Sequence, residues 1–291
     1  MFRLKIILTG SSGQVGAHVL PLLRGHEVIA PKRYELDLND VSAVRKFIEK
    51  SAPQLVINPA AYTAVDKAET EPDAAYAINA HAPEAIARAC KTIGAPLIHF
   101  STDYVYDGNA TRPWTEQDAA RPISVYGASK LAGEAAIAAS GCAHIILRTS
   151  WVYSKFGKNF LLTMQRLAAE KEFLRVVADQ YGTPNWAGTI ASAVAHIVEK
   201  PAAQLAAVSG VFNLNSHGAT SWHGFASAIV AAGTRQIPVH AISTADFPTP
   251  AKRPAYSVLD AGKFECAFGF AMPFWGDALA QCLRAPAPIV Q

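Results

Sequence analysis

The sequence of 291 residues is poor in cysteine, in excess charge of either sign and in long apolar runs. Its four cysteines are widely separated, form no CxxC pair and have no histidines at metal-ligand spacing. They are Cys90, Cys142, Cys266 and Cys282. This pattern argues against a disulfide framework or a zinc site and favours reduced thiols in a cytoplasmic protein.

The charges are balanced, with 26 Lys and Arg against 23 Asp and Glu, and the basic residues are scattered. We therefore expect no nucleic-acid partner. The longest apolar runs, such as "HIILRT" and "KIILTG", fall short of the roughly 20 residues of a membrane helix. The first residues lead into a glycine motif without a small-residue cleavage site, which predicts a strand and not a signal peptide.

The first half of the chain alternates short apolar runs with amphipathic segments, beginning "LKIILTG", "QVGAHVLPLLRG" and "HEVIAP". Such alternation predicts an α/β fold with a doubly wound, Rossmann-like parallel sheet over residues 1–150. Beyond Trp151 the pattern becomes irregular and rich in proline. We expect a smaller mixed α/β C-terminal lobe formed by residues 151–187 and 216–291 to bind substrate, with about 188–215 folding back onto the first domain.

A glycine motif follows the first predicted strand. In "LTGSSGQVGAHVL", Gly10, Gly13 and Gly16 open a helix with GxxGxxG spacing, which allows backbone amides to approach a dinucleotide pyrophosphate. The spacing departs from GxGxxG, and the alternative is that these glycines only form the turn.

The end of the second predicted strand usually selects the cofactor. Here it offers Lys32 and Arg33, two cations that suit the 2′-phosphate of NADP, or that form a solvated basic loop. Asp37 is placed either to accept from the adenine amino group or to cap a helix beginning near Asn39. We expect NADPH as the cofactor, with NADH also accepted.

Tyr126 and Lys130 in "YGASKLAGE" are four residues apart and share a helix face. A nearby ammonium group lowers the pKa of a phenol, which makes it a usable general acid, although such pairs also arise by chance. Ser101 and Thr102 end a buried parallel strand, where α/β sheets bind ligands. His99 lies in mid-strand and is interpreted as a core histidine.

In this order the motifs "TGSSGQVG", "NPAAYTAVDKAE", "STDYVYDG", "YGASKLAGE" and "LRTSWVY" resemble the extended short-chain dehydrogenase/reductase superfamily, and more narrowly the dTDP-4-dehydrorhamnose reductase family. The resemblance implies that Thr102, Tyr126 and Lys130 form a catalytic triad. NADPH or NADH then reduces C4 of a nucleotide-linked keto sugar while Tyr126 protonates the alkoxide. Thr102 orients the carbonyl, and Lys130 also binds the nicotinamide ribose.

The resemblance implies further binding residues. The expected cofactor contacts are Gly10, Ser12, Gly13, Gln14, Val15, Lys32, Arg33, Asp37, Leu38, Asn58, Ala60, Ala61, Tyr62, Asn79, Tyr126 and Lys130. The expected substrate contacts are Val65, Asp66, Ser101, Thr102, Asp103, Tyr104, Trp151, Asn159 and Arg253.

Several of these residues also have purely structural interpretations. Asp66 and Glu69 fit the start of a helix, Trp151 fits a core position and Asn159 fits a helix cap. Arg253, in the proline-stiffened "PTPAKRP", is expected to clamp the substrate diphosphate, or else is an exposed arginine.

Two activities of relatives are not carried over. Dehydratases of the superfamily have Asp followed by Glu after the threonine, whereas Asp103 is followed here by Tyr104. Some family members form metal-bridged dimers through glutamates, but His18 and Gly188 stand at those positions. We expect no metal, and a monomer or a homodimer.

Two other functions remain open. One is an epimerase or reductase of another nucleotide-linked keto sugar. The other is a non-catalytic, NADP-binding partner protein similar to the regulatory subunit of methionine adenosyltransferase, which the intact triad argues against.

Overall fold

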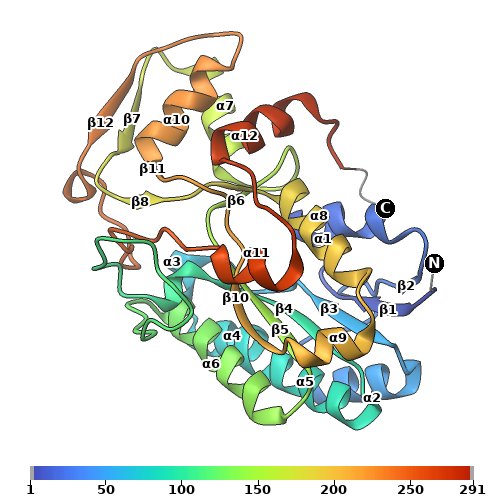
Figure 1. The fold of residues 1–291 in the computed structure, drawn as a ribbon. Coiled ribbons are helices and arrows are strands. Elements are labelled where there is room, and N and C mark those ends of the chain that lie inside the picture. The colour runs from blue at the N-terminus through green and yellow to red at the C-terminus, as the bar shows by residue number, and fades with distance from the viewer. Residues whose placement is uncertain (1–2, 289–291) are drawn as a thin grey trace.

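The computed structural model describes residues 3–288, and its larger lobe is built on a six-stranded parallel sheet (Figure 1). The strand order is β10-β5-β4-β3-β1-β2, and every adjacent pair is parallel. The strands are β1 (Lys5–Leu8), β2 (Glu27–Ile29), β3 (Leu55–Asn58), β4 (Leu97–Thr102), β5 (His144–Thr149) and β10 (Gly210–Asn213). The predicted doubly wound α/β fold is confirmed.

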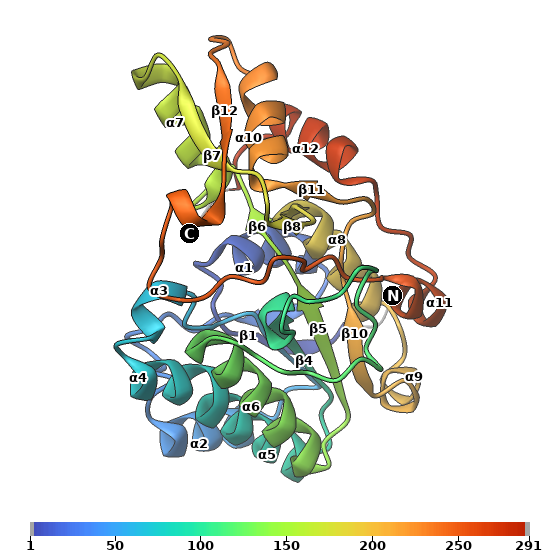
Figure 2. The same cartoon turned by 90° about the vertical axis from the view of Figure 1, so that its left-hand side faces the viewer.

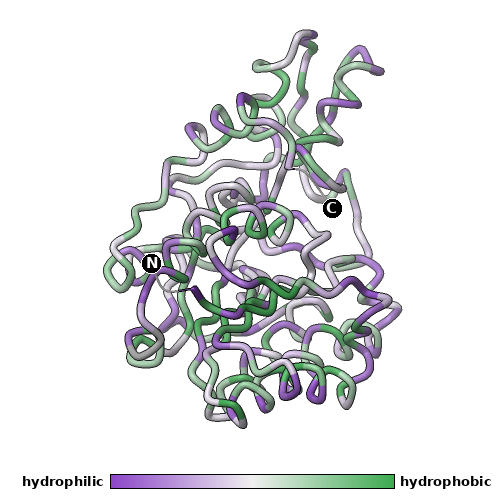
Figure 3. Tube along the Cα trace, turned by 90° about the vertical axis from the view of Figure 1, so that its right-hand side faces the viewer, coloured by the Kyte–Doolittle hydropathy of each residue, from purple (hydrophilic) through white to green (hydrophobic). Residues whose placement is uncertain are grey.

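Both faces of this sheet are buried, because successive strand residues point to opposite sides. On β1, Ile6 and Leu8 belong to one hydrophobic cluster and Ile7 to the other. One face is covered by α2 (Val41–Ser51), α5 (Ala82–Ile93) and α6 (Val125–Ser140), and the other by α1 (Gln14–Val19) and α8 (Ala187–Val198), as Figures 1 and 2 show. Figure 3 shows the hydrophobic residues concentrated along the strands between these layers.

Helix α6 carries the tyrosine and lysine of the YxxxK motif, and both of its ends are fixed by the local sequence. The hydroxyl of Ser124 accepts from the backbone N–H of Gly127 at 3.2 Å and caps the first turn. Gly141 ends the helix in the left-handed conformation with φ of 70°.

The smaller lobe packs around a core of its own, which includes Tyr153, Leu161 and Phe225. It contains the parallel pair β7 (Leu174–Val177) and β12 (Val239–Ile242), with α7 (Phe160–Glu170), α10 (Trp222–Ala231) and α12 (Trp275–Arg284). Two further short pairs are β6 (Val152–Tyr153) with β9 (Asn185–Trp186), and β8 (Tyr181–Gly182) with β11 (Thr220–Ser221).

The chain returns from the small lobe to the large one. Helix α8, α9 (Ala202–Ala207) and β10 lie in the range 188–215 or at its edge, and β10 completes the sheet beside β5. The limits of the two domains stay a prediction. The remaining helices are α3 (Val65–Ala68), α4 (Pro72–Tyr76), α11 (Gly262–Phe268) and the short turns η1 (Leu20–Leu23), η2 (Ala77–His81), η3 (Asp103–Val105) and η4 (Thr244–Asp246).

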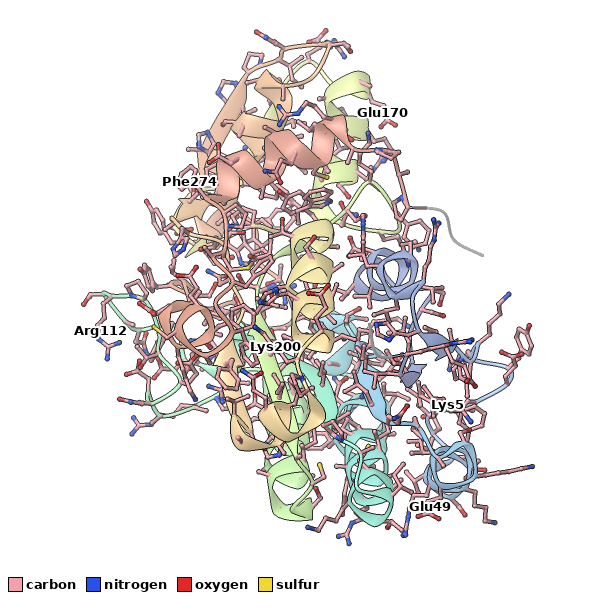
Figure 4. The ribbon with its side chains drawn as sticks, turned by 45° about the vertical axis from the view of Figure 1, so that its right-hand side comes forward. Lys5, Glu49, Arg112, Glu170, Lys200 and Phe274 are labelled. Atoms are coloured by element: carbon pink, nitrogen blue, oxygen red, sulfur yellow. The ribbon has the colours of Figure 1, made fainter. Side chains whose placement is uncertain are left out.

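Charged side chains lie mainly at the periphery. Lys5, Glu49, Arg112 and Glu170 project outward in Figure 4, and each has an oppositely charged neighbour. Within residues 3–288, no helix combines the length and the apolar character needed to cross a bilayer.

Candidate active site

A cleft of about 880 Å³ opens at the carboxyl edge of the sheet, where the strand order reverses between β1 and β3. It has the position and the size expected of a dinucleotide site. The predicted cofactor residues that line it are Gly10, Ser12, Gly13, Gln14, Val15, Arg33, Asp37, Leu38, Ala60, Ala61, Tyr62, Tyr126 and Lys130.

The glycine turn leaves no room for side chains. Gly10 has φ of 57°, and a Cβ atom there would lie 2.9 Å from the Cα of Ala60. A Cβ atom at Gly16 would lie only 2.2 Å from the carbonyl oxygen of Gly10. The turn therefore packs closely against the loop that follows β3, and backbone from both sides lines the cleft.

At the predicted adenosine end, Arg33 lines the cleft, whereas Lys32 does not. Asp37 accepts from the backbone N–H of Asn39 at 3.1 Å and from its side-chain amide at 2.8 Å. These two hydrogen bonds lower the pKa of the Asp37 carboxyl group. The alternative of Asp37 as a helix cap is wrong, because Asp40 caps α2 by accepting from Ala43.

Asn58 and Asn79, expected as cofactor contacts, do not line the cleft and are fully engaged in the interior. Asn79 accepts from the N–H of Tyr62 at 2.9 Å and donates to its carbonyl oxygen at 3.0 Å and to Ser129 at 3.0 Å. Asn58 bonds Thr9 and His99. Both residues hold the surrounding loops in place.

Tyr126 and Lys130 line the cleft, and Thr102 lies beside Tyr126 without lining it. Thr102 ends β4, and its hydroxyl lies near Tyr126, where it favours the phenolate form. Burial nevertheless dominates and raises the pKa of Tyr126 to about 12, so the expectation of a lowered pKa is wrong. The phenol keeps its proton across the neutral range, which is the form that a proton donor needs.

Lys130 follows Tyr126 by one turn of α6 and is almost entirely buried. Its Nζ donates to the carbonyl oxygen of Phe100 at 2.6 Å and lies 3.3 Å from Nε2 of His99. Burial lowers the pKa of Lys130 to about 8, and the negative charge of Glu134 opposes this effect. The amine is therefore still mainly charged near pH 7.

Two buried hydroxyl groups at the cleft have no hydrogen-bond partner among residues 3–288. They are Oγ of Ser101 and Oγ1 of Thr149, from the adjacent strands β4 and β5. Buried hydroxyl groups are normally satisfied, so these two fit the polar groups of a bound ligand. A dinucleotide such as NADP fits the residues of this cleft.

Asp103 follows Thr102 and is also buried. Its Oδ1 accepts from the Thr102 hydroxyl at 2.9 Å, while Oδ2 has no partner. Burial raises the pKa of Asp103 to about 6, with Ser257 and Thr102 opposing that shift.

On the substrate side, aromatic and charged groups connect Tyr126 with the C-terminal segment. The ring of Tyr104 meets that of Tyr126 edge to face at 5.6 Å, and the Arg253 guanidinium lies over the Tyr104 ring at 5.9 Å. Nη2 of Arg253 donates to Asp66 at 2.8 Å, whereas Nη1 is buried and has no partner in the described part of the chain. A half-buried guanidinium whose Nη1 group has no partner suits an anionic ligand.

The other predicted substrate residues have structural contacts. Trp151 has φ of 43° and stacks on Trp222 with ring centroids 3.5 Å apart, and both rings pack against the core of the small lobe. Asn159 caps α7 by accepting from Leu162 at 3.2 Å, and its amide nitrogen donates to Gln14 at 2.9 Å.

Asp66 and Glu69, the acidic residues of the α3 region, both form contacts with other segments. Asp66 lies in the first turn of α3 but pairs with Arg253. Glu69 accepts from the backbone N–H of Val125 at 2.9 Å and so stabilises the start of α6. Val65 begins α3 and is half-buried.

Sequence reasoning missed one cation of the cleft. Lys158, with Phe156 and Gly157, lines it from the loop that follows β6. The only signal in the sequence is the order of residues in "WVYSKFGKNF", a glycine and a lysine shortly after a strand. This loop lies against the glycine turn through the Gln14–Asn159 hydrogen bond.

His18 and Gly188 stand at the two positions considered above for a metal bridge. His18 forms a hydrogen bond with the hydroxyl of Ser154 at 2.9 Å, and Gly188 leaves space for the ring of Trp186. Residues 3–288 contain no cluster of three or more His, Cys, Asp or Glu suited to a metal ion.

A parallel sheet with a cleft of dinucleotide size at its switch point, lined by the tyrosine and lysine of a YxxxK motif, is typical of the short-chain dehydrogenases/reductases. Comparison with known proteins narrows this class. The family model described as RmlD substrate binding domain matches residues 4–287. A dTDP-4-dehydrorhamnose reductase of Burkholderia thailandensis is 43% identical, over 97% of this chain and 98% of that protein.

Solved structures agree with this assignment. A Clostridium acetobutylicum dTDP-4-dehydrorhamnose reductase has a TM-score of 0.91 at 39% identity, covering 96% of this chain and 98% of that one. The Bacillus anthracis enzyme of the same name, in complex with NADP, has a TM-score of 0.92 at 33% identity and covers 97% and 99%. The chain belongs to the dTDP-4-dehydrorhamnose reductase family.

Proposed function

We propose that this chain reduces the C4 keto group of dTDP-4-dehydro-L-rhamnose to dTDP-L-rhamnose with NADPH, and that Tyr126 is the general acid. The observation that carries the proposal is that Tyr126 and Lys130 line a cleft of dinucleotide size, with Thr102 beside Tyr126. The NADP complex of the Bacillus anthracis relative supports the cofactor, and the names of the relatives support the substrate.

The chain's own residues perform the proton transfer. When bound, NADPH supplies the hydride. The Thr102 hydroxyl donates to Asp103, so Tyr126 is the neighbouring group with a proton to give to the developing alkoxide. The charge of Lys130 stabilises the tyrosinate that remains.

The substrate binds on the side of the C-terminal segment. Arg253 has a free, buried N–H group for the diphosphate, and Tyr104 separates this guanidinium from Tyr126. The stacked pair of Trp151 and Trp222 is half-buried on the small lobe and offers an aromatic surface to the substrate. NADH is a second, weaker cofactor in this proposal, and the enzyme is a monomer or homodimer.

The proposal also assigns the enzyme to the cytoplasm, because its four cysteines are free and suit a reducing compartment.

The test is NADPH oxidation by purified protein, with dTDP-4-dehydro-L-rhamnose formed in the same cuvette, and Tyr126→Phe as the control. We expect oxidation that the control loses. If NADPH binds but no oxidation occurs, while a keto sugar carried on another nucleotide is reduced, the substrate assignment is wrong. If binding occurs without turnover of either substrate, a non-catalytic NADP-binding protein becomes the better description.

A further inference from the structure

His99 contacts the side chain of Lys130, and both of its ring nitrogens have polar neighbours. The residue is in the middle of β4 and is fully buried. Its Nε2 lies 3.3 Å from Nζ of Lys130, and its Nδ1 lies 3.1 Å from the amide nitrogen of Asn58. Asn58 in turn accepts from the Thr9 hydroxyl through its amide oxygen. These four side chains form a continuous buried chain from β1 to α6.

The imidazole in this chain is neutral. Burial, together with the charge of Lys130, lowers the pKa of His99 well below its ordinary value. A neutral imidazole has one N–H donor and one acceptor nitrogen, whereas an ammonium group has only donors. When Lys130 is charged, Nε2 must therefore accept from it, and the ring proton must lie on Nδ1.

This requirement extends to Asn58. An N–H group at Nδ1 needs an acceptor, which only the amide oxygen of Asn58 can provide at that position. The two orientations of an amide group fill the same space, so the amide can present its oxygen to His99 and its nitrogen to Thr9. The orientation with nitrogen toward His99 instead leaves the proton on Nε2, and this arrangement matches a neutral Lys130 amine.

We propose that His99 is a positioning residue for Lys130. Its Nε2 accepts a hydrogen bond from the ammonium group of Lys130, while Asn58 holds the imidazole in the Nδ1–H form. The four hydrogen-bonded side chains then have two consistent sets of proton positions, one for each protonation state of Lys130. Accepting through Nε2, His99 favours the charged form of the buried lysine and fixes the direction of its side chain. The catalytic part of this inference rests on the proposed function, whereas the hydrogen-bond arrangement does not.

The other ionisable groups around Lys130 are few. On its own helix they are Tyr126, one turn before it, and Glu134, one turn after it; Glu134 is paired with Arg148 of β5 at 2.5 Å. From β4 and its end they are His99 and Asp103. Among these groups, His99 contacts the lysine Nζ directly, at 3.3 Å.

The first experiment is nitrogen NMR on protein labelled in its histidines, which needs neither substrate nor activity. The His99 signals are identified by their loss in His99→Gln. Near pH 7 we expect the Nδ1–H tautomer, changing toward Nε2–H as the pH rises above about 8 and Lys130 loses its proton. An Nε2–H tautomer near pH 7 overturns the proposal, as does a tautomer that stays the same at high pH.

The second experiment compares two variants in the reductase assay. His99→Gln retains an acceptor oxygen near the position of Nε2, whereas His99→Leu keeps the bulk and removes the acceptor. For His99→Leu we expect the alkaline decline of kcat/KM to begin about one pH unit lower, a loss of about fivefold relative to the wild type at pH 8. In His99→Gln, the pH at which kcat/KM begins to fall should be close to that of the wild type. Identical profiles for two folded variants contradict the role, and failure of the wild type to reduce the sugar leaves the NMR result to decide it.

Discussion

The carboxylate of Asp66 lies 2.8 Å from the guanidinium of Arg253, although 187 residues separate them in the chain. Asp66 belongs to α3 of the large lobe, and Arg253 belongs to the proline-rich segment that leads back from the small lobe. The same arginine lies over the Tyr104 ring, which contacts Tyr126. The pair therefore connects the predicted diphosphate site with the proposed proton donor.

Arg253→Lys should raise KM for the nucleotide-sugar by about 10-fold and leave the Kd for NADPH unchanged, because an ammonium group cannot bind Asp66 and a phosphate in the same planar geometry. Steady-state kinetics and a fluorescence titration of NADPH measure the two effects. Arg112→Lys is the matched control, since Arg112 is exposed and pairs with Asp118. Equal changes in both variants contradict the assignment of Arg253.

Tyr126→Phe should lower kcat by roughly 100-fold or more while leaving NADPH binding largely intact, because the variant lacks the proton donor but keeps the ring. Rapid-mixing measurements with bound NADPH report the reduction step directly. Near-normal turnover means that another group donates the proton.

Arg33→Ala should raise KM for NADPH far more than for NADH, because Arg33 lines the cleft at the predicted position of the 2′-phosphate. Lys32→Ala is the matched control, since Lys32 is the adjacent cation but does not line the cleft. The ratio of kcat/KM for the two cofactors measures the effect. An equal loss with both cofactors contradicts the 2′-phosphate assignment, and a larger effect at Lys32 transfers it to that residue.

Lys158→Gln should weaken NADPH binding about two- to fivefold at low salt, with a smaller difference at high salt, since the contribution of an exposed cation is screened. Fluorescence titration of NADPH at two salt concentrations provides the measurement. Lys171→Gln is a control, because that exposed lysine of the small lobe does not line the cleft. No difference between the two variants assigns Lys158 to the surface alone.

Asp103→Asn should stabilise the protein more at pH 8 than at pH 5. The folded pKa of about 6 lies above the ordinary value of 3.8, so the buried carboxylate costs stability above that folded pKa. Below both values the carboxyl group is protonated in both states, and the cost disappears. We expect a gain of about 1 to 3 kcal/mol at pH 8, shrinking as the pH falls. Urea unfolding at the two pH values measures it, and a gain independent of pH contradicts the electrostatic cause.

The sheet and most of the cleft were predictable because they depend on local patterns. Apolar runs of strand length, such as the one containing Ile6 and Ile7, specify buried parallel strands, and Gly10 specifies a turn that excludes side chains. The order of these elements along the chain then brings Tyr126 to the end of β4.

The electrostatics of the site were not predictable from spacing. The four-residue separation of Tyr126 and Lys130 suggests a direct effect on the phenol, but burial raises its pKa, and Lys130 is directed toward Phe100 and His99. Burial depends on what packs over a residue, and that comes from distant segments. Lys158 was missed for the same reason, since its loop reaches the glycine turn only through the fold.

Strand β10 joins the sheet beside β5 after the chain has passed through much of the small lobe. During synthesis, β5 therefore leaves the ribosome with an open edge, and its partner follows only some 60 residues later. A piece of the chain ending near residue 150 keeps that edge open, with the apolar residues of β5 beside it, and such edges promote aggregation. The nucleotide-binding half of this protein is consequently not a detachable module, and its assembly waits for the other half.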